Sequence, residues 1–398
     1  MTTPTEAEGA IRDGMPAFGP QIVQLGEAAG RVLAQPAAAE RDQPPFDRVT
    51  MDGIAIRYSD LKLGLRFRIA GTLAAGSPPV TGTPQSQCLR IMTGAVLPAD
   101  LDTVVPIERI EIDEAFAEIS ASAEISPGQF VHRRGSDRQA GERVLSPGTV
   151  LGPAEIAVLA SVGAGTVSVA GLPDVAIIST GDELVGPEDP VLPHQIRSSN
   201  DHAIAAGLIR HRLATVNRHR LNDDEAALLA TISRLHDAHD LLILSGGVSM
   251  GQFDYVPAVL QTLGCEVRFH KIRQKPGRPM WFGVSGQGKP IFALPGNPVS
   301  TLLCMTRYVI PAFRFAAGIP QRPPLEFQLE HAVEGPKDLT YFVPVVLMPT
   351  RDGGTVASPR PTNTSGDFTT LAGTDGFLEL PPGSGNHAAG SAGRFFGW

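Results

Sequence analysis

The chain has 398 residues, which is more than one compact core usually holds and therefore predicts two to four domains. Hydrophobic residues make up 42% of the chain and charged residues 19%, which is the balance of an ordinary globular protein. The net charge of -8 argues against a nucleic-acid-binding surface as the main function, although a local basic cluster could still bind a small anion.

The cysteines and the N-terminal sequence indicate the compartment. Cys88, Cys265 and Cys304 are scattered and form no CxxC pair, so neither a disulfide framework nor a cysteine zinc site is expected. They fit reduced core residues of a cytosolic protein. The N-terminus is polar, and no apolar run approaches the length of a membrane span. We therefore expect a cytoplasmic protein that contacts neither membrane nor nucleic acid.

The first 171 residues predict three parts. Residues 1–20 form an N-terminal segment that is expected to pack on the central domain. Two helix candidates, LGEAAGRVLA and GPAEIAVLASVG, assign residues 21–45 and 138–171 to a connecting domain. Between them, residues 46–137 contain short alternating runs separated by turns, such as CLRIMTGAV, and these runs predict a β-rich lobe.

Residues 172–318 alternate between strand and helix patterns, which predicts an open, largely parallel, doubly wound sheet with helices on both faces. Residues 319–398 alternate between Gly/Pro turns and predict a small β-barrel. The expected strands of the central domain are 174–179, 213–218, 241–244, 282–284 and 291–294. We expect one helix after a cap at Asn200 or Asp201 and a second after a cap at Asn222 or Asp223. Two further helices are expected at 256–263 and 298–316.

Three glycine-containing turns follow predicted parallel strands. They are STGDEL at 179–184, SGGVSMG at 245–251 and LPGNPVS at 294–300. Ligands of open α/β sheets bind outside the carboxyl ends of the strands, and the N–H groups of the following helices favour anions. One such turn is more often a tight connection only. Three in one sheet favour a phosphate or oxyanion site.

Charged residues stand beside these turns. Lys275 and Arg278 flank a Pro-Gly turn, which is either a solvated basic loop or a pair of cations for a phosphate or tetrahedral oxyanion. Asp182 and Glu183 lie in the first turn, and Asp254 follows the second. A single aspartate there is more often a turn or cap residue. Several carboxylates beside a phosphate-binding pocket favour a hard cation, and Mg²⁺ fits best.

Seven motifs follow one another within residues 20–310, and their joint order and spacing are specific. They are FDRVTMDG, RIMTGAVLP, RRGSD, ISTGDEL, SGGVSMGQFDY, KPGRP and LPGNPVS. This set resembles the molybdopterin molybdenumtransferases, the family that includes the gephyrin E domain. The resemblance implies a multidomain α/β plus β homodimer of four-domain chains. Its central domain resembles molybdopterin adenylyltransferases and binds the adenylated pterin.

The resemblance also implies roles for individual residues. The implied catalytic residues are Asp52 of MDG, Thr93 of MTGA, Asp137, Glu183 and Asp254, and the implied Mg²⁺ ligands are Asp182, Glu183 and Asp254. The implied substrate-binding residues are Thr180, Gly181, Asp182, Ser245, Gly246, Gly247, Ser249, Lys275, Arg278, Pro295, Gly296, Asn297, Pro298 and Ser300.

The implied reaction is Mg²⁺-dependent insertion of molybdate into the dithiolene of adenylated molybdopterin, with release of AMP. Each active site is implied to be shared between the two subunits. The implied protein partners are molybdopterin adenylyltransferase and the apoproteins of molybdoenzymes.

Two alternatives remain open. A molybdopterin adenylyltransferase would need only the central domain, so the MDG and MTGA motifs and the C-terminal β domain argue against it. A non-catalytic scaffold of the gephyrin E-domain type is the second alternative. The presence of Asp52, Thr93 and Asp137 beside Glu183 and Asp254 favours an enzyme.

Overall fold

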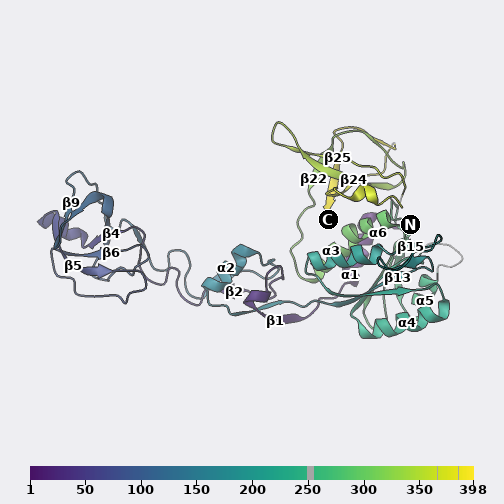
Figure 1. Ribbon diagram of the computed structural model, residues 1–398, viewed down its shortest axis with the longest axis horizontal. Coiled ribbons are helices and arrows are strands. Elements are labelled where there is room, and N and C mark those ends of the chain that lie inside the picture. Colours follow the sequence, from purple (N-terminus) through teal and green to yellow (C-terminus); the bar gives the residue numbers. More distant parts are fainter. Residues whose placement is uncertain (249–254, 365, 384) are drawn as a thin grey trace. The chain divides into compact units, whose positions relative to one another are not determined.

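The computed structural model describes residues 1–248, 255–364, 366–383 and 385–398 (Figure 1). These residues fall into two compact units. The first comprises Met1–Gln35, Pro147–Ile156 and Thr166–Trp398, and the second comprises Pro36–Ser146 and Ala157–Gly165. Among the described helices, none has both the length and the apolar character needed to cross a membrane.

A six-stranded sheet of order β16-β13-β17-β21-β20-β18 forms the centre of the first unit. The first four strands in this order are parallel, and β20 and β18 continue the sheet antiparallel at one edge. The predicted open, largely parallel sheet is thereby confirmed. The strands are β13 (Asp174–Thr180), β16 (Thr215–Leu221), β17 (Leu241–Ser245), β18 (Glu266–His270), β20 (Trp281–Val284) and β21 (Pro290–Leu294).

Helices cover both faces of this sheet, because successive strand residues point to opposite sides. Val175 of β13 packs in an apolar cluster with α3 (Asn200–Arg210), whereas Ala176 packs in another with α4 (Glu225–Ala238) and α5 (Val256–Thr262). Figure 1 shows α3 and α4 on opposite sides of β13. The doubly wound arrangement follows directly from the buried, unbroken apolar run of β13.

An N-terminal helix, α1 (Pro4–Gly14), joins the cluster on the α3 side through Ala7 and Ile11. Its start is fixed by a capping box. The Thr3 hydroxyl accepts a hydrogen bond from Glu6 N–H at 3.3 Å, and the Glu6 carboxylate accepts one from Thr3 N–H at 2.8 Å. Residue Thr2 also bridges to Ile272, so the N-terminus is attached to the central sheet region at two places.

Several predicted boundaries are wrong. The cap of α4 is Asp224, whose side chain accepts from Ala227 N–H at 2.7 Å, and not Asn222 or Asp223. The cap of α3 is Ser199 instead of Asn200 or Asp201. The predicted strand at 213–218 is shifted to Thr215–Leu221, and the edge strand β18 was not predicted because most of its residues are exposed.

Two helix predictions also need correction. The segment LGEAAGRVLA forms only a 3-10 turn, Leu25–Glu27, after which Val32 and Leu33 make isolated β-bridges. The predicted helix at 298–316 divides into α6 (Pro298–Cys304), one π-helical turn (Met305–Val309) and α7 (Ile310–Ala316). The other candidate, GPAEIAVLASVG, is helical over Pro153–Ser161 (α2).

The C-terminal part of the first unit is a closed five-stranded barrel, as predicted. Its strands pair in the order β24-β25-β22-β28-β26, and β26 returns to β24. Strand β19 (Gln274–Lys275) adds in parallel to β24, so the chain just before the Pro-Gly turn is attached to the barrel. The barrel strands are β22 (Glu326–Leu329), β24 (Thr340–Pro349), β25 (Thr355–Pro359), β26 (Gly376–Leu380) and β28 (Ala392–Gly397).

The second unit contains the predicted β-rich sheet, of order β7-β4-β6-β5-β9-β8. Strands β4 and β6 are antiparallel and pair Gly53 with Ile91. A Cβ at Gly53 would lie 1.9 Å from the Val105 carbonyl oxygen, so only glycine fits there. The strands are β4 (Gly53–Ile56), β5 (Arg66–Leu73), β6 (Gln87–Ile91), β7 (Thr103–Pro106), β8 (Ile110–Ile112) and β9 (Phe116–Ile119).

Short two-stranded ladders complete both units. In the second unit they join β2 (Ala37–Ala38) with β11 (Arg143–Leu145) and β3 (Arg48–Val49) with β10 (Val131–His132). In the first they join β1 (Pro20–Gln24) with β12 (Thr166–Ala170), β14 (Leu184–Val185) with β15 (Ile196–Arg197), and β23 (Val333–Glu334) with β27 (Asn386–His387).

The three cysteines are free and buried. Burial raises the pKa of the Cys88 thiol to about 12 and that of Cys265 to about 11. At neutral pH these thiols are therefore protonated core residues, as expected for reduced cysteines.

Candidate functional site

A pocket of about 810 Å³ lies at the carboxyl ends of β13, β17 and β21. After β13 the chain goes to β16 on one side and then returns to β17 on the other, so the sheet order reverses there. Such a reversal opens a crevice between neighbouring strand ends, which is where open α/β sheets bind ligands. The described lining residues come mainly from the segments 179–184, 196–200, 245–248 and 295–298, with Asp223, Pro279, Gly366 and Phe368 added.

The SGG turn after β17 lies directly against Thr180 at the end of β13. A Cβ at Gly246 would come within 2.6 Å of the Thr180 carbonyl oxygen, and one at Gly247 within 3.0 Å of its hydroxyl. Both glycines also have positive φ values, +100° and +64°, that favour glycine. The Thr180 and Ser179 hydroxyls are buried and make no hydrogen bond within the described residues. They line the pocket and can bond to a ligand oxygen.

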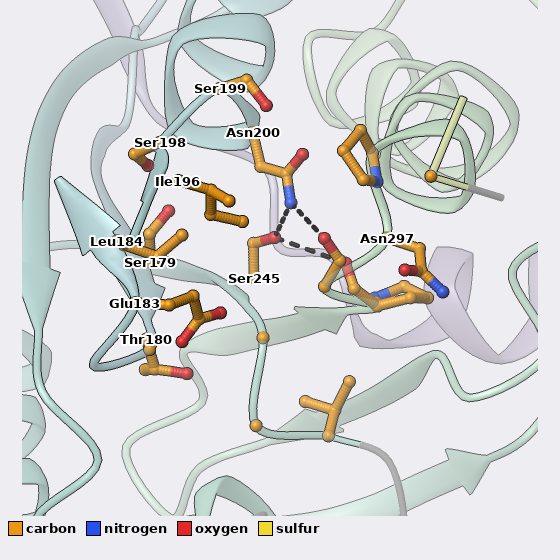
Figure 2. A pocket seen from close by; sticks show the side chains of 18 of the residues that line it. Ser179, Thr180, Glu183, Leu184, Ile196, Ser198, Ser199, Asn200, Ser245 and Asn297 are labelled. Carbon is orange, nitrogen blue, oxygen red and sulfur yellow. Dashed lines mark hydrogen bonds between the residues drawn. The ribbon is translucent and has the colours of Figure 1, made fainter. Parts of the chain in front are cut away.

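Asn200 joins the ends of two strands. Its side-chain amide donates to the Ser245 hydroxyl at 2.9 Å and to the Gly296 carbonyl at 2.7 Å (Figure 2). Ser245 in turn donates to the Pro295 carbonyl at 3.3 Å. The SGG and PGN turns are thereby held together at the start of α3. Ser199 holds the cap position of α3, and Asn200, the first residue of the helix, lines the pocket.

Carboxylates border the same strand end. A Cβ at Gly181, whose φ is +151°, would lie 2.7 Å from a carboxylate oxygen of Glu183, so Glu183 folds closely over this glycine. One oxygen of Asp182 accepts from Asp223 N–H at 3.1 Å, and Asp182, unlike Glu183, does not line the pocket. Carboxylates beside an anion-binding turn would repel a phosphate ligand, and a cation bound between them would remove this repulsion. Mg²⁺ typically takes one or two carboxylates together with phosphate oxygens, so this donor set fits it.

A metal site built by the protein alone is not found, because no group of three potential ligands occurs within the described residues. Two predicted residues, Ser249 and Asp254, lie outside those residues. The predicted ligand set of Asp182, Glu183 and Asp254 therefore has two described members, and both lie in the turn after β13.

The Pro-Gly turn after β19 is supported from α6. Gly277 N–H donates to the Ser300 hydroxyl at 3.2 Å, and the Gln274 amide donates to the Gly277 carbonyl at 3.3 Å. Ser300 is therefore a buried support and does not line the pocket. Lys275 and Arg278 are exposed and do not line the pocket either, although their neighbour Pro279 does.

Asp52 and Thr93 meet in the second unit. Asp52 directly precedes β4 and Thr93 follows β6, and the antiparallel pairing of these strands places both residues at one end. One oxygen of Asp52 accepts from the Thr93 hydroxyl at 2.6 Å and from Thr93 N–H at 2.7 Å. These two bonds, the hydroxyl first, lower the pKa of the Asp52 carboxyl.

Asp137 lies elsewhere in the same unit and has its own support. His132 Nε2 bonds to its carboxylate at 2.8 Å, and Arg48 donates to His132 Nδ1 at 3.0 Å. Because arginine can only donate, Nδ1 is the acceptor and the neutral imidazole carries its proton on Nε2. Arg48 and His132 face each other because β3 and β10 pair at this position.

The structure thus brings ten predicted residues together in one pocket: Thr180, Gly181, Glu183, Ser245, Gly246, Gly247, Pro295, Gly296, Asn297 and Pro298. Sequence reasoning missed Ser198, Ser199 and Asn200, Asp223 and Phe368, which also line it. The run RSSN before a helix was a usable signal, since Ser and Asn are preferred at helix starts and a helix start often faces an anionic ligand. No pattern in the sequence singled out Phe368.

The chain is similar to known proteins along its whole length. Three family models match it in order: the MoeA N-terminal region (domain I and II) at residues 2–163, a probable molybdopterin binding domain at 176–314, and the MoeA C-terminal region (domain IV) at 327–392. Two curated relatives are named molybdopterin molybdenumtransferase. The Synechocystis sp. protein is 38% identical over 400 residues, covering 100% of both chains, and the Nostoc sp. protein is 36% identical over 306 residues, covering 75% of this chain and 70% of its own.

A solved structure is also similar along the full length. The crystal structure of the molybdopterin biosynthesis MoeA protein from Pyrococcus horikosii is 31% identical, with a TM-score of 0.84 and 100% coverage of both chains. The fold described above is therefore also the fold of a solved relative.

Proposed function

The chain belongs to the molybdopterin molybdenumtransferase family, and from this premise we propose that it is a transferase of molybdenum-cofactor biosynthesis. It inserts molybdate into the dithiolene of adenylated molybdopterin and releases AMP. The observation that carries this proposal is the pocket at the carboxyl ends of β13, β17 and β21, where glycine turns, the buried Ser179 and Thr180 hydroxyls and the Glu183 carboxylate meet.

The pocket residues have separate tasks in this proposal. The backbone N–H groups of Gly247 and Gly296 hold phosphate oxygens, because glycine allows a close approach, whereas Gly246 N–H donates to the Leu294 carbonyl at 3.2 Å and shapes the turn. The buried Thr180 hydroxyl gives a further bond to the ligand. Fixed donors of this kind need no reorganisation as charge shifts during cleavage of the adenylate linkage.

Mg²⁺ is the proposed cofactor. Asp182 and Glu183, with Asp254 outside the described residues, would hold it, and when bound it would neutralise phosphate charge at the adenylate linkage. Without a cation, Glu183 over Gly181 would repel an anionic ligand. The requirement for a divalent cation follows from that repulsion.

Lys275 and Arg278 are proposed to hold molybdate, since two cations on a stiff turn suit a tetrahedral oxyanion. We also propose that the protein is a homodimer in which Asp52 and Thr93 of one subunit complete the site that contains Glu183 of the other. Both points rest on the family relationship. The remaining proposals are a cytoplasmic location, molybdopterin adenylyltransferase as supplier of the substrate, and molybdoenzyme apoproteins as receivers of the product.

The experiment is to incubate the purified protein with adenylated molybdopterin and to follow AMP release. We expect release only when molybdate and Mg²⁺ are both present. Omission of molybdate and chelation of the cation serve as separate controls. Equal release with and without molybdate would exclude the molybdenumtransferase function, and release without a divalent cation would exclude the cofactor.

A further inference from the structure

Phe368 is an aromatic side chain in a pocket wall otherwise made of small, polar and aliphatic residues. It is the only aromatic among the described lining residues, and it is 39% exposed. Leu184 and Ile196 line the same pocket, and Ile196 is 57% exposed. The pocket therefore offers hydroxyl groups and glycine turns to a phosphate, and an exposed apolar surface to a nonpolar part of the ligand.

The turn that carries Phe368 is held by its neighbour Asp367. The Asp367 carboxylate accepts hydrogen bonds from Asn363 N–H at 3.3 Å and from the Asn363 amide at 3.1 Å. It also accepts from the Thr369 and Thr370 hydroxyls, each at 3.0 Å. Four bonds to one carboxylate fix the backbone on both sides of Phe368, while the phenyl ring itself takes no part in them.

A second anchor ties this turn to the pocket wall. Phe368 precedes the 3-10 helix Thr369–Leu371, and Leu371 is buried in an apolar cluster with Val299 and Leu303 of α6. Helix α6 begins directly after the PGN turn that lines the pocket. The aromatic side chain is therefore placed relative to the phosphate-binding turns by packing, although it comes from the C-terminal part of the chain.

We propose that Phe368 stacks on a planar heteroaromatic ring of the substrate and thereby selects for it. An exposed aromatic side chain on a fixed turn loses little conformational entropy when a ligand binds to it. Its ring can stack on a flat aromatic ring of that ligand. The inference rests on the proposed function, because adenylated molybdopterin carries two such rings, the pterin and the adenine. Both have the required chemistry, and the test separates them.

The test compares Phe368→Ala, Phe368→Leu and Phe368→Tyr. Loss of one stacking contact should raise the KM for adenylated molybdopterin about 5- to 100-fold in Phe368→Ala, with kcat within about twofold of wild type. Phe368→Tyr keeps the ring and should keep the wild-type KM. Phe368→Leu keeps the apolar volume but not the ring, so its KM should stay close to that of Phe368→Ala.

Phe315→Ala is the matched control. Phe315 is also 39% exposed, but it lies on α7 and does not line this pocket. Its substitution should leave KM unchanged. Circular dichroism and thermal unfolding of each variant separate a binding defect from a folding defect, and Phe368→Tyr shows whether the turn tolerates substitution.

Direct binding by calorimetry, with AMP and with a soluble pterin as separate ligands, identifies the ring. A weaker affinity of Phe368→Ala for AMP alone assigns the adenine, and a weaker affinity for the pterin alone assigns the pterin. The proposal is overturned if wild type binds neither ligand, if Phe368→Ala binds both as wild type does, or if Phe368→Leu restores wild-type KM. Binding does not require transfer, so a wild-type protein that binds a ring but releases no AMP contradicts the proposed function only.

Discussion

At the scale of single residues, the Asp52–Thr93 pair lowers the pKa of a predicted catalytic carboxyl. The carboxylate keeps a lowered pKa because the Thr93 hydroxyl and N–H both donate to it. A carboxyl whose folded pKa is depressed contributes stability above its unfolded pKa of about 3.9, and that stability is lost as pH falls through the folded pKa. Asp52 is therefore ionised at every pH at which the enzyme is expected to work.

Thr93→Val removes the hydroxyl but keeps the N–H donor. We expect the pKa of Asp52 to rise toward the usual aspartate value and to remain below it. Thr93→Ser, which retains both donors, should titrate as wild type does. A carbon-13 NMR titration of the Asp52 carboxyl measures the shift, and an Asp52 pKa that does not move in Thr93→Val would show that the hydroxyl bond contributes nothing to it.

At the scale of elements, Asn200 connects the start of α3 to the turns after β17 and β21. Asn200→Ala removes both hydrogen bonds and leaves the buried Ser245 hydroxyl with one partner fewer. We expect stability to fall by about 1–2 kcal/mol and the KM for the adenylated substrate to rise. Thermal unfolding and steady-state kinetics measure the two effects separately.

The matched variant is Asn217→Ala. Asn217 also donates a hydrogen bond through its side-chain amide, to the Asp174 carboxylate at 2.9 Å, but this partner lies at the amino end of β13, away from the pocket. Its KM should stay at the wild-type value. If both asparagine variants change KM alike, the connection through Asn200 has no special importance for the pocket.

The elements also show what sequence could and could not predict. Buried strands such as β13 and β17 are uninterrupted apolar runs closed by glycine turns, so the sheet and its phosphate-compatible edge were predictable. Most residues of the edge strand β18 are exposed, so it lacks the apolar run of a buried strand, and LGEAAGRVLA has helical composition but forms a 3-10 turn and isolated β-bridges. In both segments the secondary structure depends on pairing with other segments of the chain, and the local sequence pattern carries no information on that pairing.

The site divides in the same way. Glycine turns carry a local signal, because their backbone conformation demands particular residues. Phe368 carries no such signal, because only the fold brings its segment to the pocket, whereas Asn200 stands in the run RSSN at the start of α3. The roles assigned to all of the predicted site residues, Lys275, Arg278 and Asp137 among them, and the division into four domains remain predictions.

At the scale of the whole molecule, a buried ion cluster connects α1, the π-helical turn and the barrel within the first unit. Arg307, 1% exposed, donates to Glu8 at 2.8 Å and to Glu379 at 2.9 Å. Glu379 also bonds to Arg394. Burial lowers the pKa of Arg307, but the charge of Glu379 and the other neighbours raises this pKa by more, so the guanidinium stays protonated.

Arg307→Met removes the central cation and leaves Glu379 buried with one partner fewer. Loss of one member of a buried pair costs roughly 3–5 kcal/mol. Arg268→Met breaks an exposed pair with Glu266 and should cost at most about 1 kcal/mol. Chemical denaturation measures both, and similar losses in the two variants would show that the Arg307 cluster does not stabilise the unit.

The proposed dimer makes a prediction of its own. Asp52→Ala and Glu183→Ala homodimers should each have two damaged sites. A mixed dimer with one variant on each chain should collect both lesions in one site and keep the other intact. Random mixing gives about half mixed dimers, so roughly a quarter of wild-type activity should return. Verified mixed dimers, isolated with two tags, that are as inactive as their parents would show that the sites are not shared.

The most direct test of the proposed transfer is its stoichiometry. In a single turnover with adenylated molybdopterin, molybdate and Mg²⁺, the AMP released and the molybdenum retained on the pterin are quantified in the same sample. The two quantities should be equal at every time point, and Glu183→Gln should lower them together. AMP release without molybdenum incorporation, or incorporation without AMP, would contradict molybdate insertion coupled to cleavage of the adenylate linkage.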